Sequence, residues 1–207
     1  MSGFGSPQAT WNQRFATDAY IFGEAPNAYL QSRRADLQPG SALAVADGEG
    51  RNGVWLAEQG LQVHAFDFSE HAIAKAQKLA DKRHTRLTLS CSAWQDFTWA
   101  EQAFDNVVAI FIQFAPPQER VQLFALMDRA LKPGGTLILQ GYSHEQLQYN
   151  TGGPGKLEHL YDEALLKESF AHYDLLDLRT YTQEVDEGSA HKGMSGLIGM
   201  SARKRQG

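Results

Sequence analysis

The chain has 207 residues, of which 43% are hydrophobic, and its 19 basic and 24 acidic side chains give a formal net charge of −5. This length and composition suit one compact domain with a substantial core, and they exclude a chain that is disordered as a whole. The mildly acidic balance, without a long basic stretch, argues against nucleic acid or an anionic membrane surface as the main partner, because both attract clustered positive charge.

The hydrophobic segments are too short to cross a membrane. The longest uninterrupted apolar run covers residues 107–112, whereas a spanning helix requires about 20 apolar residues. The first fifteen residues carry neither a basic leader nor an apolar core, so no secretory signal is expected. Cys91 is the only cysteine, which rules out an internal disulfide and favours a reduced, cytoplasmic location.

In chain order, apolar periodicity predicts short strands that alternate with helices. Residues 1–36 are expected to form a helical cap or lid, because Trp11, Phe15 and the segment 20–34 have the spacing of one or two amphipathic helices, with a turn at residues 23–26. The expected buried strands cover residues 42–46, 62–66, 86–89, 106–112 and 136–140. The expected helices between them cover residues 51–59, 70–82 and 117–131. Such alternation predicts βαβ units and a doubly wound, largely parallel sheet.

The last part of the chain is expected to close this sheet. A polar, glycine-rich loop at 142–160 precedes a helix that Asp162 can cap, and the alternating segments 173–184 and 194–203 predict an antiparallel hairpin. The expected fold is therefore a doubly wound α/β domain over residues 1–207, with a seven-stranded, mostly parallel sheet and an antiparallel C-terminal hairpin. Within it, residues 41–140 are expected to form the nucleotide-binding core and residues 141–207 the acceptor side.

A glycine-rich loop follows the first expected strand. Residues 47–53 read DGEGRNG, in which Gly48, Gly50 and Gly53 form a GxGxxG pattern. Glycine suits this place because a Cβ would block the tight turn and the close approach of a ligand. Asp67 ends the second expected strand, where a carboxylate accepts hydrogen bonds from ribose hydroxyls. Together they indicate an adenosine-containing ligand; a structural turn with a capping aspartate is the alternative.

This pattern fits two classes of nucleotide, nicotinamide dinucleotides and S-adenosylmethionine. A nicotinamide enzyme of the doubly wound type usually adds a second mononucleotide half or a substrate domain. Here a helix and a hairpin follow the fifth expected strand, which favours S-adenosylmethionine. Two alternatives stay open: an NAD(P)-dependent reductase on a single Rossmann half, and a non-catalytic nucleotide-binding sensor or subunit.

Four segments carry a family resemblance: residues 43–60 around the glycine loop, 63–77 from the second strand into its helix, 104–114 at the fourth strand, and ALKPGGTLIL at 130–139. In these segments the sequence resembles the class I S-adenosylmethionine-dependent methyltransferases. YIFGEAPNAYL, GEGRN and EGSAHKG further resemble a bacterial branch related to tellurite-resistance methyltransferases. The resemblance implies a Rossmann-like methyltransferase fold, S-adenosyl-L-methionine as the cofactor and S-adenosyl-L-homocysteine as its product.

Two positions of the first strand depart from the family pattern. The acidic residue that most members carry there falls on Ala44, and the first motif glycine falls on Ala46. Asp47 or Glu49 is therefore expected to contact the methionine amino group instead. After the third strand, a position that is often acidic falls on Cys91 or Ser92, so backbone groups beside it are expected to recognise the adenine.

Further candidates follow from charge and aromaticity. Arg51 opposes the dipole at the start of its helix, which suggests an anionic partner such as the methionine carboxylate. Tyr20 and Phe22 are expected in a lid whose aromatic faces attract the sulfonium, although ordinary core packing is the alternative. The expected cofactor-binding residues are Tyr20, Phe22, Asp47, Gly48, Glu49, Gly50, Arg51, Asn52, Asp67, Phe68, Ser92, Ala93 and Trp94.

On the acceptor side, the expected catalytic residues are Gln113, Tyr149 and His191, and Tyr142 is a further candidate. The seven histidines show no spacing typical of a metal site, so no metal is expected. Methyl transfer from a sulfonium needs mainly alignment in a dry pocket. The expected function is in-line methyl transfer to a small, soft acceptor, a thiol or a chalcogen oxyanion. The sequence does not predict the oligomeric state.

Overall fold

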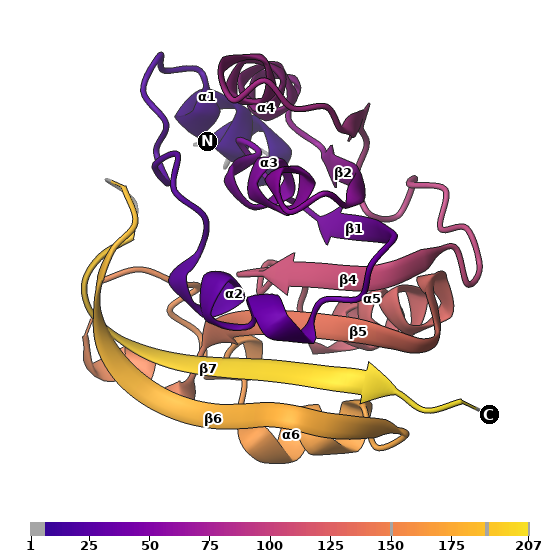
Figure 1. Ribbon diagram of the computed structural model, residues 1–207. Coiled ribbons are helices and arrows are strands. Elements are labelled where there is room, and N and C mark those ends of the chain that lie inside the picture. Colours follow the sequence, from indigo (N-terminus) through magenta and orange to yellow (C-terminus); the bar gives the residue numbers. More distant parts are fainter. Residues whose placement is uncertain (1–6, 150, 189–190, 207) are drawn as a thin grey trace.

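The computed structural model describes residues 7–149, 151–188 and 191–206 and is built on one seven-stranded sheet (Figure 1). The strands are β1 (Ser41–Val45), β2 (Gln62–Asp67), β3 (Thr88–Cys91), β4 (Phe104–Ile110), β5 (Leu131–Tyr142), β6 (Tyr173–Asp186) and β7 (Lys192–Lys204). Their order is β3-β2-β1-β4-β5-β7-β6, and β7 pairs antiparallel with both neighbours whereas the first five strands pair in parallel. The predicted fold is therefore confirmed.

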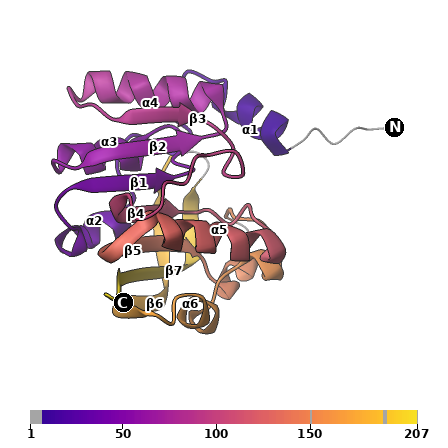
Figure 2. The ribbon, with the colours of Figure 1, turned by 90° about the vertical axis from the view of Figure 1, so that its right-hand side faces the viewer.

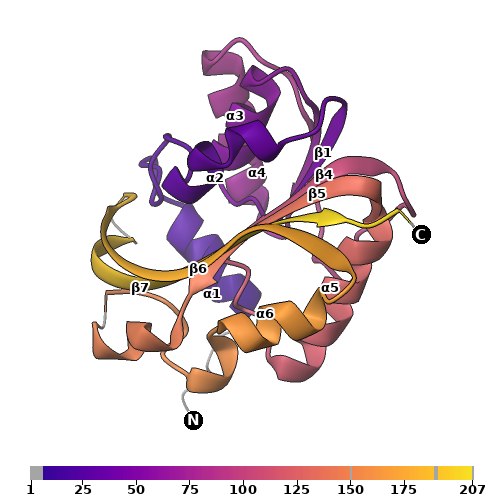
Figure 3. The same ribbon diagram turned by 60° about the horizontal axis from the view of Figure 1, so that its bottom comes forward.

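Helices cover both faces of the sheet. They are α1 (Pro7–Phe15), α2 (Ala28–Ser32), α3 (Arg51–Glu58), α4 (Glu70–Lys82), α5 (Pro117–Ala130) and α6 (Glu163–Ser169). Helices α2, α3 and α4 lie on one side of the parallel strands, and α5 and α6 lie on the other (Figure 3). None of these helices has both the length and the hydrophobicity that crossing a membrane requires in the ranges that the structure describes.

Strand β1 shows why helices must cover both faces of the sheet. Ala42 and Ala44 pack in one apolar cluster with Trp55 and Leu56 of α3, and Leu43 and Val45 pack in the other with side chains of α5 and α6. Successive side chains of a strand point to opposite faces, so a strand buried on both faces is apolar without alternation. The run SALAV satisfies this condition at the centre of the sheet.

Several predicted element boundaries are wrong by a few residues. Strand β3 begins two residues after the predicted start, because its register with β2 pairs Thr88 with His64 and Cys91 with Asp67. Strand β4 ends at Ile110, since Phe111 has a φ of 57° and leaves the extended conformation. Strand β5 begins directly after α5 and contains a register shift near its start, which hides it from a periodicity argument.

The turn predicted at residues 23–26 of the N-terminal segment is longer in the structure. Residues 20–27 form turns, and α2 starts only at Ala28, after Asn27 caps it by accepting a hydrogen bond from the Leu30 N–H. Helix α1 lies beyond the carboxyl ends of β1 and β2 (Figure 2). This position matters for function because ligands of open α/β sheets bind outside the carboxyl ends of the strands.

Candidate functional site

The chain bends sharply between β1 and α3. Ala46, Gly48 and Gly50 all have positive φ angles, of 48°, 60° and 88°. A Cβ on Gly50 would come within 2.7 Å of the Ala76 Cα in α4, so only glycine allows α4 to pack this closely on the bend. Ala46 occupies the left-handed region despite its Cβ, which accounts for the expected glycine at this position in the family pattern.

Asp67 is joined to this bend by a hydrogen bond. Its Oδ2 accepts from the Gly48 N–H at 3.0 Å, and its Oδ1 accepts from the Ser69 N–H at 2.9 Å. The residue is 4% exposed, and burial raises the pKa of its carboxyl to about 6 although the backbone hydrogen bonds act in the opposite direction. The glycine bend and the carboxylate therefore form one unit, as the spacing of the motif predicts.

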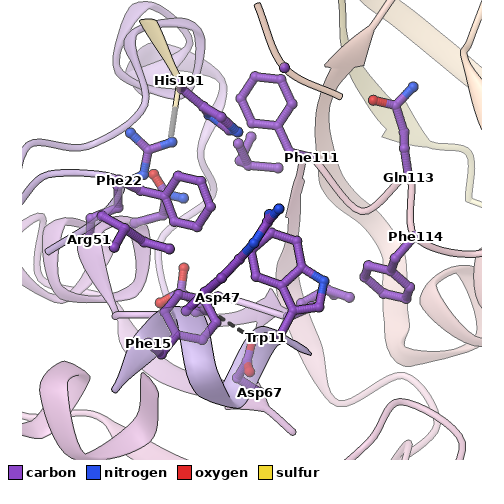
Figure 4. A pocket seen from close by; sticks show the side chains of 18 of the residues that line it. Trp11, Phe15, Phe22, Asp47, Arg51, Asp67, Phe111, Gln113, Phe114 and His191 are labelled. Carbon is purple, nitrogen blue, oxygen red and sulfur yellow. Dashed lines mark hydrogen bonds between the residues drawn. The ribbon is translucent and has the colours of Figure 1, made fainter. Parts of the chain in front are cut away.

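A cavity of about 660 Å³ opens at this unit, within the range of small-molecule sites. In Figure 4, Asp67 lies at one end, and Arg51, Phe22 and His191 lie towards the other. The wall is formed by Trp11, Arg14, Phe15, Ile21, Phe22, Val45, Ala46, Asp47, Gly48, Arg51, Asn52, Asp67, Phe68, Val108, Ile110, Phe111, Gln113, Phe114, Tyr142, Gly152, Gly153, Pro154 and His191. The cavity is thus enclosed by α1, the glycine bend, the ends of β4 and β5, and the segment between β6 and β7.

Most of the predicted site residues line this cavity. They are Phe22, Asp47, Gly48, Arg51, Asn52, Asp67, Phe68, Gln113, Tyr142 and His191. The predicted residues that do not line it are Tyr20, Glu49, Gly50, Ser92, Ala93, Trp94 and Tyr149. The structure therefore gathers segments that lie up to 170 residues apart, and it separates some close sequence neighbours.

The residues outside the wall have structural contacts instead. The Tyr20 hydroxyl donates to the Lys75 carbonyl at 2.9 Å, so this ring packs on α4 rather than over a ligand. Glu49 is buried and pairs with the Lys75 ammonium at 2.7 Å. The Trp94 carbonyl accepts a hydrogen bond from the Trp99 indole inside the core. These three side chains fix the frame around the cavity and do not face it.

Gln113 lines the cavity but already uses both polar atoms of its amide. Its Nε2 donates to the carbonyls of Tyr142 and His159, and its Oε1 accepts from the Tyr142 N–H. In Figure 4 its amide points away from the centre of the cavity. This geometry joins the segment after β4 to the end of β5, which is a structural role.

The predicted site residues did not include those that line the cavity from α1 and from the 152–154 loop. Trp11 stacks on Phe15 with ring centroids 5.6 Å apart, and both rings lie 6.1 Å from the Phe22 ring. The spacing of Trp11 and Phe15 by one helical turn predicted only that they belong to a helical cap or lid. Arg14 lies with its guanidinium 4.9 Å from the Trp11 ring centroid. An aromatic layer therefore covers the carboxyl ends of the strands.

Glu187 connects three separate segments beside the cavity, and no sequence signal identified it. It accepts a hydrogen bond from Arg51 at 2.7 Å, from the Asn27 amide at 3.0 Å and from the Ala28 N–H at 3.2 Å. Burial alone would raise the pKa of its carboxyl, but contacts with His191 and Arg51 lower it to about 2. Glu187 is therefore ionised at neutral pH and holds the β6–β7 connection against α3.

Two ionisable side chains in the cavity wall are not fully paired with other groups of the protein. Arg51 Nη1 is buried and has no hydrogen-bond partner among the residues that the structure describes. Asp47 accepts a hydrogen bond from the Gly53 N–H at 3.0 Å, yet burial raises the pKa of its carboxyl to about 7. Buried polar groups are normally paired, so these two indicate a ligand with one negative and one positive group.

The Asp47 carboxyl has a testable effect on stability. Because its pKa is raised from 3.8 to about 7 in the folded state, folding is favoured by protonation, and this stability is complete below pH 4 and lost as the pH rises through 7. We expect Asp47→Asn to stabilise the ligand-free protein at pH 8, by on the order of 1–3 kcal/mol, and much less at pH 5. Urea unfolding of both proteins at the two pH values measures this, with the exposed Asp96→Asn as the control; an equal effect at both pH values would contradict it.

Part of this chain matches a known protein family. Residues 42–135, from β1 to the start of β5, match the family described as the methyltransferase domain. Among curated proteins, none is similar enough in sequence to be a significant match. The matched segment contains the glycine bend, Asp47, Arg51 and Asp67, which are the parts of the site that the sequence motif predicted.

Solved structures agree with the fold over nearly the whole chain. A protein solved in a study of the conversion of a disulfide bond into a thioacetal group during echinomycin biosynthesis has a TM-score of 0.76 at 18% identity, covering 96% of this chain and 90% of that one. TehB from Haemophilus influenzae has a TM-score of 0.71 at 18% identity, covering 96% and 67%. The 1,6-didemethyltoxoflavin-N1-methyltransferase from Burkholderia thailandensis, with S-adenosylhomocysteine bound, has a TM-score of 0.63 at 20% identity, covering 86% and 79%.

Fold and site together define a doubly wound α/β protein with a small-molecule cavity at the carboxyl ends of its parallel strands. Residues 42–135 of the chain match the methyltransferase domain, in agreement with the resemblance seen in the sequence. The solved structures are only 18–20% identical to this chain, so their similarity supports the fold alone. Membership of the bacterial tellurite-resistance branch therefore stays a prediction.

Proposed function

We propose that this enzyme binds S-adenosylmethionine in the cavity at the glycine bend and transfers its methyl group to a small, soft acceptor. The observation that carries the proposal is the unit of Gly48 and Asp67, which are hydrogen-bonded to each other on the wall of an open cavity. A carboxylate in this position accepts hydrogen bonds from the ribose hydroxyls of an adenosine. The glycine bend leaves room for the ligand to approach the backbone.

The methionine end of the ligand matches the two uncompensated charges. The buried Arg51 Nη1 is a donor for its carboxylate, and Asp47 is an acceptor for its amino group. The raised pKa of the Asp47 carboxyl supports this assignment, because an ammonium group beside it stabilises the ionised form. Asp47 rather than Glu49 therefore takes the place of the missing acidic residue in β1, since Glu49 is already paired with Lys75.

The aromatic layer suits the cationic sulfur. Trp11, Phe15 and Phe22 line the same side of the cavity, and aromatic faces attract cations when water is excluded. The donor is activated by its own positive charge, so the protein contributes mainly by aligning the acceptor, the methyl group and the sulfur. Alignment in a closed pocket gives effective molarities of about 10⁵–10⁸ M.

The acceptor end of the cavity is aromatic. Phe111, Phe114 and Tyr142 line it together with His191, and Gly152 and Gly153 bring the backbone close. Much of the volume is needed for the cofactor, which favours a small acceptor. We infer a soft one, a thiol or a chalcogen oxyanion, because sulfur and its heavier congeners attack a methyl group without strong activation.

Calorimetry tests the proposal. We expect S-adenosylmethionine and S-adenosylhomocysteine to bind to the purified protein with micromolar dissociation constants, and NADH not to compete with them. No heat at millimolar S-adenosylmethionine, or tighter binding of NADH, would overturn the assignment. Release of S-adenosylhomocysteine with thiols, tellurite or selenite then measures turnover.

A further inference from the structure

His191 is held at the acceptor end of the cavity by aromatic rings. Its ring centroid lies 4.5 Å from that of Phe111, 4.6 Å from that of Phe22 and 5.8 Å from that of Tyr142. No hydrogen bond to either imidazole nitrogen is formed by the residues that the structure describes. A side chain that lines a cavity with its polar atoms unused is available to a ligand.

Glu187 defines which nitrogen of His191 is available. Its Oε2 lies 4.0 Å from His191 Nδ1, and the carboxylate is fixed by Arg51, by the Asn27 side chain and by the backbone of Ala28. A carboxylate beside Nδ1 favours the tautomer that carries its proton there. The lone pair then lies on Nε2, at the opposite edge of the ring.

The charged and titratable groups that face His191 come from three elements. They are Glu187 from the β6–β7 connection, Arg51 from α3 and Tyr142 from β5. Burial lowers the pKa of His191, which outweighs the contact with Glu187, so the ring is neutral at neutral pH. Burial also raises the pKa of the Tyr142 hydroxyl, which therefore stays uncharged. Among these groups the acceptor end thus holds one neutral base, and Arg51 is its only cation.

We propose that His191 is the general base of the methyl transfer, that Glu187 is its positioning residue, and that the acceptor enters as an uncharged thiol. This inference rests on the proposed function. An oxyanion would need positive charge at this end, but Arg51 is used by Glu187 and, in the proposed function, by the methionine carboxylate, and Arg14 lies on the Trp11 ring in α1. A thiol suits an imidazole base because the pKa values of the two groups lie within a few units of each other.

The step is balanced without another reactant. The thiol gives its proton to Nε2 of His191, and its sulfur forms the new bond to the methyl carbon. The bond between that carbon and the donor sulfur breaks, and its electron pair stays on the donor sulfur. The products are a methyl thioether, S-adenosylhomocysteine and a protonated His191, which Glu187 stabilises until the proton passes to water.

His191→Gln tests the base with two thiols of different acidity. For 2-mercaptoethanol, a thiol that is protonated at neutral pH, we expect kcat to fall about 10²–10⁴-fold. For 4-nitrothiophenol, which brings its own thiolate, we expect a change of less than about threefold, because no proton remains to be removed. The dissociation constant of S-adenosylmethionine is expected to change little, and His144→Gln, at a side chain that is 41% exposed, serves as the control.

Each other result overturns the inference. An equal loss with both thiols would deny a proton-transfer role, and a loss of cofactor affinity in place of kcat would assign His191 to the cofactor. Turnover of tellurite or selenite by the wild type, without turnover of thiols, would replace the acceptor class and leave the proposed function intact. Absence of S-adenosylmethionine binding by the wild type would remove the proposed function itself.

Glu187→Gln tests the positioning role through a readout that needs no turnover. Removal of the carboxylate charge destabilises the imidazolium, so the pKa of His191, followed by NMR of the ring proton signals, is expected to fall. The acidic limb of kcat/KM against pH for 2-mercaptoethanol, where protonation of the base lowers activity, is expected to shift in the same direction. An unchanged or higher pKa of His191 would show that Glu187 does not act on it.

Discussion

Glu187→Ala is expected to lower the free energy of unfolding by about 3–5 kcal/mol, the usual cost of breaking a buried ion pair by removing one partner. The substitution leaves the Arg51 guanidinium, whose side chain is 6% exposed, without its carboxylate. It also removes the acceptor for the Asn27 amide and the Ala28 N–H, so the N-terminal segment loses its link to the β6–β7 connection. Urea unfolding at pH 7 measures the loss.

A matched control lies on the same segment. Glu184 in β6 is exposed, so Glu184→Ala is expected to change the free energy of unfolding by less than about 0.5 kcal/mol. Adding Arg51→Met to Glu187→Ala is expected to recover part of the loss, because the double variant no longer buries a lone charge. A cost below about 1 kcal/mol for Glu187→Ala alone would show that the ion pair does not hold the segments together.

The role of Glu187 could not be predicted from the sequence, because it depends on contacts between remote segments. It lies 136 residues from Arg51 in the chain, and no local sequence pattern predicts an ion pair between residues so far apart. The next residue, Gly188, has a φ of 77°, and a Cβ there would come within 2.6 Å of the Gly23 nitrogen. Loop docking of this kind is set by tertiary packing, whereas the glycine bend is set by local backbone conformation.

The predictions that succeeded relied on local physics. Strands buried on both faces read as apolar runs, and the glycine pattern with Asp67 requires only one strand–turn–helix unit and its neighbour. The site role of Tyr20 was inferred from an expected aromatic lid, and that of Trp94 from its place after the third strand, but their side chains turn towards Lys75 and the core. The direction of a side chain in an irregular segment does not follow from periodicity.

Asp67→Asn is expected to weaken the binding of S-adenosylhomocysteine about 100-fold. Each hydrogen bond from a ribose hydroxyl to a charged carboxylate contributes about 1.5–3 kcal/mol, and two such bonds make a loss of about 3 kcal/mol a conservative expectation. Asparagine is the informative change, because alanine would leave the N–H groups of Gly48 and Ser69 both unpaired and confound binding with stability. Calorimetry of the wild type, of Asp67→Asn and of the exposed Asp96→Asn measures the effect.

The pH dependence of ligand binding is a second test of the role of the Asp67 carboxylate. The pKa of Asp67 is raised to about 6 in the ligand-free protein, and hydroxyl donors favour its ionised form, so ligand binding is linked to loss of a proton. The affinity of the wild type for S-adenosylhomocysteine is therefore expected to rise as the pH increases through about 6. Asparagine cannot titrate, so the rise becomes shallower in Asp67→Asn, and the part that remains reports on Asp47. Unchanged affinity together with an unchanged pH profile in Asp67→Asn would remove the carboxylate from the binding site, and with it the observation on which the proposed function depends.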